Sequence, residues 1–221
     1  MKMVKKGLAI VLMTAVLLTV FTPFVVAEEF YTYNGHTYEQ GIDRVECLNL
    51  VDESAYAELH RAVDAAVLDW DWHLGLLNEQ YDVYWNLISY VGNTAESVPM
   101  IRFETMSIEE YESNMGSISD DAIGVALYYT VTSGVNLQRV NELSENWETI
   151  TVFFFTDRLQ QNGCLNDYDY LRELANHEIG HALGLAHDPE DCGVIMYGGS
   201  DDRTAYVPTA KDLQTIYYLY G

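Results

Sequence analysis

The chain has 221 residues, enough for one domain with a proper hydrophobic core. Its 34 acidic and 11 basic residues give a formal net charge of −23, which disfavours nucleic acids and anionic membranes as partners. A saline habitat, several calcium sites or a merely soluble acidic surface would each account for this charge, and composition does not choose among them.

Residues 1–27 have the pattern of a signal peptide. Three lysines precede an apolar run from Gly7 to Ala27, whose last residues, Val25-Val26-Ala27, are small or tolerated before a cut. We therefore expect cleavage after about Ala27, export from the cell, and no stable membrane association of the mature protein. The alternative is an uncleaved N-terminal anchor, because this run is long enough to span a bilayer.

Residues 28–44 are predicted to form an N-terminal arm or a short pro-segment, and residues 45–221 the domain itself. The first long helix is predicted from about Ala55 to Leu77, with Asp52 and Ser54 as candidate N-caps. Apolar residues recur along it at the spacing that builds one buried helix face. They include Leu59, Ala62, Val63, Ala66, Val67 and Trp70.

Strands are predicted in the middle of the chain. The segments are Val98–Phe103, Ile123–Val131 and Ile150–Thr156, with Tyr84–Val91 as a strand or a loop. Ile150–Thr156 is apolar enough to be a central strand. Residues 107–121 and 132–147 are predicted as polar connections with room for short helices. No internal repeat or flexible linker interrupts this order.

Two helices are predicted in the last third. One runs from about Asp167 to Leu183, with Asn166 as its N-cap and Asp169 near the positive end of the helix dipole. The other runs from about Thr209 to Leu219. With the strands before them, these helices predict an α+β fold.

The predicted helix over 167–183 leads into the most informative motif of the chain. Its pattern is His-Glu-x-x-His-x-x-Gly-x-x-His, formed by His177, Glu178, His181, Gly184 and His187. Residues four apart return to the same side of a helix, so His177 and His181 can bind one metal ion. Glu178 is rotated by about 100° from His177, which puts it beside the metal, where a general base stands.

A third ligand at His187 requires the chain to leave the helix and turn back. Gly184 suits that turn, because glycine tolerates the left-handed conformation that ends helices. Three protein nitrogens leave a fourth position for water, as in a catalytic zinc site. The longer pattern makes a chance match on an amphipathic helix improbable.

This segment resembles the metzincins, a clan of zinc endopeptidases with this elongated motif and a methionine turn. The resemblance implies a zincin-like catalytic domain with a twisted mixed sheet, a backing helix, the zinc-binding helix, the methionine turn and a C-terminal helix. The three histidines of the motif are then the ligands of one catalytic Zn²⁺, and Glu178 is the base. Met196 forms the hydrophobic floor beneath the metal.

Within the clan, the chain is closest to a divergent matrixin. Asp188, which follows the third histidine, is similar to the adamalysins. Met196-Tyr197 and the Leu-Tyr-Gly ending of residues 210–221 are similar to matrixins, although Gly198 replaces the usual proline. Motif-level resemblance covers about residues 165–221.

The resemblance also implies how a substrate binds. An extended peptide would pair with an edge strand, here Ile123–Val131, in the β-augmentation mode. The segment Gly198–Pro208 would line the pocket for the residue after the cut, which is expected to be hydrophobic. The candidate pocket residues are Tyr206, Val207 and Pro208, with Tyr197 either reaching the site or only packing.

Three cysteines remain after the motif is assigned. A Cys164–Cys192 disulfide would tie the segment with His187 to the helix entry, and is permissible after export. The alternative is two or three free thiols. Cys47 could inhibit a latent form by binding zinc, but the Pro-Arg-Cys-Gly sequence of matrixin propeptides is absent, which favours an unused thiol.

Several carboxylate-rich stretches could bind Ca²⁺, although none has the EF-hand pattern. They are Asp167 and Asp169, then Asp188, Glu190 and Asp191, then Asp201 and Asp202. A solvated acidic face also explains each of them. Asp188 is expected to order its turn rather than to perform chemistry.

The sequence therefore predicts a secreted, monomeric zinc endopeptidase that acts on a peptide or protein. The alternative is a zinc-containing binding or regulatory protein that kept the fold without turnover. Hydrolysis of a non-peptide amide is a third possibility. The presence of Glu178 favours an enzyme.

Overall fold

The computed structural model describes residues 30–39, 41–89, 100–132, 136–142, 145–199 and 202–221. The predicted signal peptide, residues 1–27, lies outside these ranges. Tyr31–Gly221 groups into one unit. Within the described ranges, no helix has both the length and the apolar character needed to cross a bilayer.

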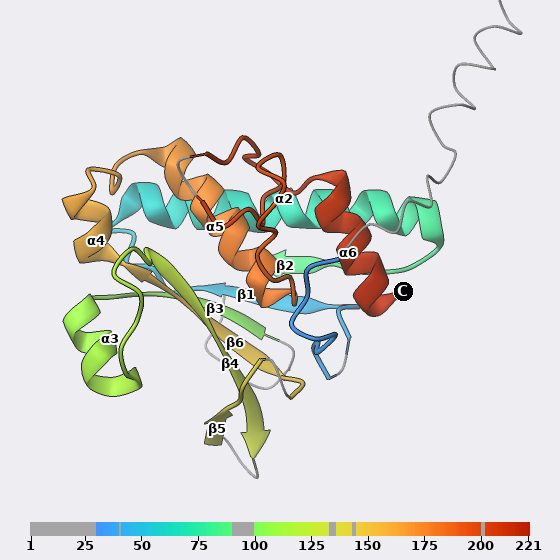
Figure 1. The fold of residues 1–221 in the computed structure, drawn as a ribbon, viewed down its shortest axis with the longest axis horizontal. Coiled ribbons are helices and arrows are strands. Elements are labelled where there is room, and N and C mark those ends of the chain that lie inside the picture. Colours follow the sequence, from blue (N-terminus) through green and yellow to red (C-terminus); the bar gives the residue numbers. More distant parts are fainter. Residues whose placement is uncertain (1–29, 40, 90–99, 133–135, 143–144, 200–201) are drawn as a thin grey trace, which may run out of the picture. The chain divides into compact units, whose positions relative to one another are not determined.

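The described part of the chain contains one six-stranded sheet with the strand order β2-β1-β3-β6-β4-β5 (Figure 1). Its strands are β1 (Val45–Asn49), β2 (Leu87–Ser89), β3 (Met100–Met106), β4 (Gly124–Thr132), β5 (Asn136–Arg139) and β6 (Thr149–Phe155). The pairs among β1, β2, β3 and β6 are parallel, whereas β4 is antiparallel to both β6 and β5. The predicted α+β fold with a mixed sheet is confirmed.

β6 is an interior strand, as its apolar sequence predicts, and all its residues are buried. Successive side chains of a strand point to opposite faces. Ile150, Val152 and Phe154 belong to the main hydrophobic core, whereas Phe153 and Phe155 pack in a smaller cluster with Tyr111. Tyr111 comes from α3 (Ile108–Met115), so both faces of β6 are covered.

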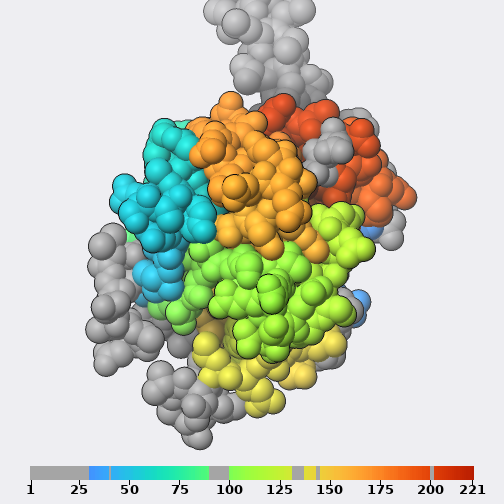
Figure 2. Space-filling model, turned by 90° about the vertical axis from the view of Figure 1, so that its left-hand side faces the viewer, coloured from blue at the N-terminus to red at the C-terminus, as the bar shows by residue number. Residues whose placement is uncertain are grey.

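α2 (Ala57–Tyr81) is the backing helix, and it packs against α5 (Tyr168–Ala182) on one face of the sheet (Figure 1). The indole of Trp70 donates a hydrogen bond to the carbonyl of Asn176 at 2.9 Å, which joins the two helices in the core. In Figure 2 the surface of the segment around α4 and the start of α5 (orange) lies beside that of α2 (cyan).

The predicted caps of both long helices are wrong by one or more residues. α2 begins after Tyr56 without a side-chain cap, because Asp52 accepts bonds from the backbone and hydroxyl of Ser54 in a preceding turn. Asp167, rather than Asn166, caps α5, and its carboxylate accepts from the backbone N–H of Tyr170.

The remaining helices are α4 (Thr156–Gln161) and α6 (Ala210–Tyr220). α6 matches the predicted final helix and starts at Thr209 with a capping box to Asp212. The prediction missed α4, which continues directly from β6, and β5, which lies in a segment predicted as a polar connection. Both are short, so they carry too few apolar repeats to be recognised.

Candidate metal centre and catalytic cleft

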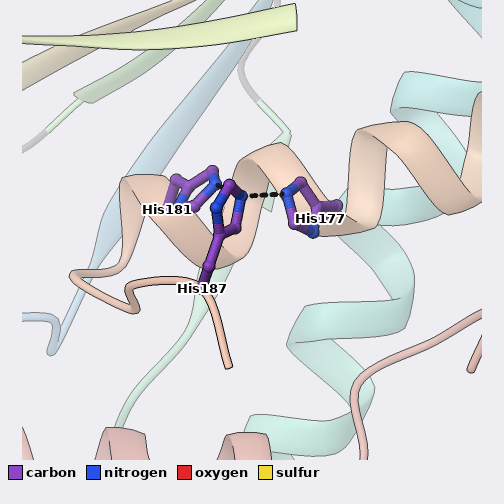
Figure 3. Close-up of side chains that lie close together, drawn as sticks. All are labelled: His177, His181 and His187. Atoms are coloured by element: carbon purple, nitrogen blue, oxygen red, sulfur yellow. Dashed lines mark hydrogen bonds between the residues drawn. The ribbon is translucent and has the colours of Figure 1, made fainter. Parts of the chain in front are cut away.

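The three predicted ligands converge. His177 and His181 project from α5, and His187 comes from the loop after it (Figure 3). The Nε2 atom of His187 lies 3.1 Å from Nε2 of His177 and 3.0 Å from Nε2 of His181. The structure thus brings one ring nitrogen of each histidine to a common point.

Backbone carbonyls set the tautomers of the two helical histidines. Nδ1 of His177 is 2.8 Å from the carbonyl oxygen of Ile195, and Nδ1 of His181 is 2.9 Å from that of Leu185. A carbonyl only accepts, so each Nδ1 carries the proton and each Nε2 presents a lone pair. Lone pairs this close together need a cation or a proton between them.

The donor set fits zinc. Zinc–nitrogen bonds of about 2.0–2.1 Å in a tetrahedral site put neighbouring nitrogens about 3.3 Å apart, close to the spacings seen here. Burial lowers the pKa of all three histidines, which favours the neutral, metal-binding form. His187 is the exposed member of the three, so the common point opens toward solvent.

Glu178 lies beside this point and is buried, with 4% of its surface exposed. Its Oε2 atom is buried without a hydrogen-bond partner among the described residues. Burial raises the pKa of Glu178 to about 8, against the opposing effect of the Arg203 charge. A buried carboxylate oxygen without a partner is costly, so its retention beside three metal-binding nitrogens points to chemistry rather than to stability.

Gly184 makes the turn that returns the chain to the metal. Its φ is +95°, a conformation that side chains with a Cβ rarely adopt. The backbone N–H of Leu185 donates to the carbonyl of Gly180 at 3.0 Å, which closes the end of α5. A Cβ at Gly184 would also lie only 3.2 Å from Leu219 of α6.

Met196, the residue of the predicted methionine turn, is buried. Its sulfur packs directly on Gly180 of α5. The preceding backbone N–H of Ile195 donates to Asp212 of α6, and the carbonyl of Met196 accepts from the N–H of Asp188. The loop that carries His187 is therefore held to both helices.

Asp188 orders this loop. Its Oδ1 accepts from the backbone N–H groups of Glu190 and Asp191, and its Oδ2 lies 2.6 Å from Nζ of Lys211. Burial alone would raise its pKa, but Lys211 and the two N–H groups lower it overall. Asp188 thus stabilises the turn after His187 and joins it to Lys211 of α6.

A cleft of about 820 Å³ opens onto the metal point. Its walls include the three histidines, Glu178, the start of β4, and Gly198 and Arg203 from the segment after the methionine turn. A volume of this size is typical of a ligand site. The cleft also holds two glycines that the motif does not single out. A Cβ at Gly124 would lie 2.7 Å from Oε1 of Glu178, and Gly198 lies against the ring of His187.

The predicted pocket residues do not line this cleft. Tyr206 is exposed and turns its carbonyl to Asn176, whereas Pro208 is buried away from the cleft, and neither Tyr197 nor Val207 is part of its walls. Arg203 takes their place. This buried guanidinium donates to Glu173 of α5 at 3.2 Å and to the carbonyl of Tyr197 at 2.8 and 3.0 Å.

Sequence reasoning missed Arg203 because its partners are distant in the chain. Nothing in the local sequence around Arg203 marks it as buried or as the partner of Glu173. Its role is to hold the segment after the methionine turn against α5, with a charge pair where a hydrophobic pocket was expected.

The predicted Cys164–Cys192 disulfide is not formed. Sγ of Cys164 lies 3.5 Å from the carbonyl oxygen of Asn162, and Cys192 is exposed. Cys164 is held in the turn after α4, where its N–H donates to the carbonyl of Leu159, whereas Cys192 is held in the loop after His187, where its carbonyl accepts from the N–H of Thr204. Cys47 is buried in β1 within the core, so its thiol does not reach the metal point.

Comparison with known proteins gives a family. The family model described as Matrixin, a peptidase family, matches residues 91–221. This span contains β4, β6, α5 and all three histidines, and it leaves α2 outside. No curated protein matches the chain.

Proposed function

Because the chain belongs to the matrixin family of zinc metalloendopeptidases, we propose that it cleaves peptide bonds with Glu178 as the general base. One observation carries this proposal. The Oε2 of Glu178, which has no hydrogen-bond partner among the described residues, lies beside three converging histidine nitrogens at the wall of an open cleft. The three histidines would hold the zinc ion. When bound there, the metal supplies an acidified water and polarises the substrate carbonyl.

Glu178 would move the proton in both halves of the reaction. Its carboxylate accepts a proton from the attacking water while the new carbon–oxygen bond forms. It then delivers this proton to the leaving amine as the carbon–nitrogen bond breaks.

The start of β4 would align the substrate. β5 pairs only with Tyr129–Thr132, whereas Gly124–Leu127 pairs with β6 on one side and with no described strand on the other. Residues 123–126 line the cleft. An extended peptide added at this edge would run past Glu178, as expected for strand addition.

The Glu178→Gln variant tests the assignment, because it keeps the side-chain shape and removes the base. We expect turnover of a casein or peptide-library substrate to fall by about 10²–10⁴-fold. Zinc content, measured by atomic absorption, should stay at the native level. Glu190→Gln is the matched control, since Glu190 is an exposed carboxylate in the loop after His187.

A native rate for Glu178→Gln would rule out the general base. If the native protein cleaves no peptide, or if its cleavage survives a zinc chelator, the peptidase proposal fails. That result would favour the zinc-containing binding protein.

We further propose that the enzyme is exported. The basic start and the apolar run of residues 1–27 support this. N-terminal sequencing of the protein from the culture medium tests the proposed cut after Ala27. Retention of the whole chain in the membrane fraction would favour the uncleaved anchor.

A further inference from the structure

An N-terminal segment reaches the metal centre from outside the motif. Residues 31–38, which we call the arm, contact the loop between α5 and His187 and, through Tyr38, the residue Trp147 before β6. Thr32 forms an antiparallel bridge with Leu185, and the carbonyl of Tyr31 accepts from the N–H of Ala186 at 2.9 Å. Both partners immediately precede His187. The arm thus lies along the segment that turns the chain back to the metal.

Tyr33 of the arm contacts a predicted zinc ligand. Its hydroxyl oxygen lies 2.8 Å from Nδ1 of His181, the ring nitrogen that faces away from the metal point. The same Nδ1 is 2.9 Å from the carbonyl oxygen of Leu185. Because Nδ1 carries the proton, His181 shares it between two acceptors, the hydroxyl oxygen of Tyr33 and the carbonyl oxygen of Leu185. These contacts limit rotation of the imidazole and keep the Nε2 lone pair toward the metal.

Tyr128 of β4 completes the contact. The hydroxyls of Tyr33 and Tyr128 are hydrogen-bonded to each other, and the hydroxyl of Tyr128 donates to the carbonyl of His181 at 2.8 Å. Tyr33 therefore donates to Tyr128 and accepts from Nδ1 of His181. The circuit of hydrogen bonds starts and ends on one residue, His181. Trp147 packs on both phenol rings, with ring centroids at 4.6 and 6.5 Å, and holds them in place.

We propose that Tyr33 is a positioning residue for the zinc ligand His181, and that the arm is a working part of the catalytic unit rather than a removable pro-segment. The proposal rests on the metal site of the proposed function, and it concerns residues that the matrixin match does not cover. For residues 31–38, the proposal favours the predicted N-terminal arm over the predicted pro-segment.

The size of the effect follows from the remaining contact. Removing a hydrogen-bond partner of a metal-bound histidine typically weakens metal binding about 10- to 100-fold. The carbonyl of Leu185 stays in place as the second acceptor of His181. We therefore expect the lower end of this range, about tenfold, for Tyr33→Phe.

The experiment compares two Tyr→Phe variants of the full-length exported protein. Tyr33→Phe removes the hydroxyl that contacts His181. Tyr38→Phe is the matched control, because Tyr38 belongs to the same arm and its buried hydroxyl has no hydrogen-bond partner among the described residues. Zinc affinity is measured by competition with a chromophoric chelator. Urea unfolding of the metal-free forms gives their stability.

Tyr33→Phe should bind zinc about tenfold more weakly, while Tyr38→Phe should stay within about twofold of the native affinity. Tyr128→Phe should also weaken zinc binding, because it removes the acceptor that orients the Tyr33 hydroxyl. The metal-free forms of Tyr33→Phe and Tyr38→Phe should differ little in unfolding free energy. With zinc saturating, Tyr33→Phe should lower kcat more than it raises KM.

Native zinc affinity in Tyr33→Phe would overturn the proposal. Equal weakening in Tyr33→Phe and Tyr38→Phe would do the same, since it would reveal a merely structural role of the arm. A raised KM alone would make Tyr33 a substrate contact instead. An active exported enzyme whose first residue lies beyond Tyr38 would exclude the arm. Zinc affinity needs no peptide substrate, so this test can fail while the peptidase proposal stands, and the reverse.

Discussion

Gly180, inside the zinc motif, sets how closely the floor of the site can approach α5. The sulfur of Met196 packs directly on its Cα side, and Trp70 of α2 lies 3.4 Å from where a Cβ would be. The motif notation treats this position as free. The structure shows that it is not, because the methionine turn and the backing helix both pack against it.

Gly180→Ala should therefore destabilise the protein. The added methyl group would overlap Met196 in a closely packed core, which costs about 1–3 kcal/mol. Gly75→Ala is the control, because Gly75 lies in α2 with open space at its Cβ position. That variant should gain about 0.4–1 kcal/mol. Urea unfolding measures both, and equal effects of the two substitutions would contradict the packing argument.

The three thiols should differ in reactivity. Burial raises the pKa of the Cys47 thiol, with a smaller contribution from the charge of Asp71, so its reactive thiolate is scarce in the folded protein. Cys192 is exposed. Alkylation of the native protein, followed by peptide mass spectrometry, should modify Cys192 and spare Cys47 until urea is added. A Cys164–Cys192 disulfide peptide would contradict the structure.

At the scale of the elements, one buried ion pair joins α5 to the segment after the methionine turn. The side chains of Arg203 and Glu173 are 4% and 9% exposed. Burial raises the pKa of Glu173 and lowers that of Arg203, which disfavours both charged forms. The opposite charge of the partner acts against each of these shifts and so favours the charged pair. The pair contributes to the cleft wall, and its loss would leave a charge in the core.

Arg203→Met should destabilise the protein by about 3–5 kcal/mol, because it leaves Glu173 buried without its partner. The double variant Arg203→Met with Glu173→Met should recover much of this loss. Arg61→Met is the control, since the Arg61–Glu58 pair is largely exposed and contributes at most about 1 kcal/mol. Unfolding free energies measure all three. A double variant no more stable than Arg203→Met would contradict the argument.

The elements that could be predicted from the sequence are those with long patterns. α2 and α5 repeat apolar residues over several turns, and β6 is apolar throughout, so their place in the core follows from local sequence. β5 and α4 could not be predicted, because each spans about one turn or a few residues. The caps failed for a different reason. Asp52 and Asn166 are both residue types that cap helices well. In the structure, however, Asp52 accepts hydrogen bonds from Ser54 in the turn before α2, and Asp167 caps α5 instead of Asn166.

At the scale of the whole molecule, the three candidate metal ligands could be predicted from the sequence, whereas the other residues that surround the site could not. The three histidines lie within one short motif, in which helix periodicity brings His177 and His181 together and the turn at Gly184 returns His187 to them. Tyr33, by contrast, is 148 residues from His181, and Arg203 is 30 from Glu173. Such contacts depend on how the sheet, the arm and the last loops are placed together, which no local pattern records.

Alkaline pH should unfold the molecule through its buried phenols. Burial raises the pKa of Tyr33, Tyr38, Tyr128 and Tyr220 above the ordinary value of 10. The folded state therefore favours neutral phenols. Their contribution is fully present below about pH 10 and is lost as the pH rises above it, because the unfolded chain then ionises first.

The free energy of unfolding should fall above about pH 10 by up to about 1.4 kcal/mol per pH unit for each of these phenols. Urea unfolding at several pH values, with tyrosinate absorbance recorded in parallel, measures this. In the native protein these four residues should ionise only with unfolding, because burial raises their pKa values. A flat stability profile above that pH would contradict the burial of the phenols.

The edge of β4 at Gly124–Leu127, which no described strand covers, can also favour self-association. A strand edge without a neighbour is a template on which a second copy of the same protein can add its own strand. Each copy carries a net charge of −23, so mutual repulsion opposes that encounter. Concentrated salt shortens the range of this repulsion to about 3 Å at 1 M. The acidity of the chain would therefore oppose self-association at low ionic strength and keep the edge available for peptides, and this protection should weaken in concentrated salt.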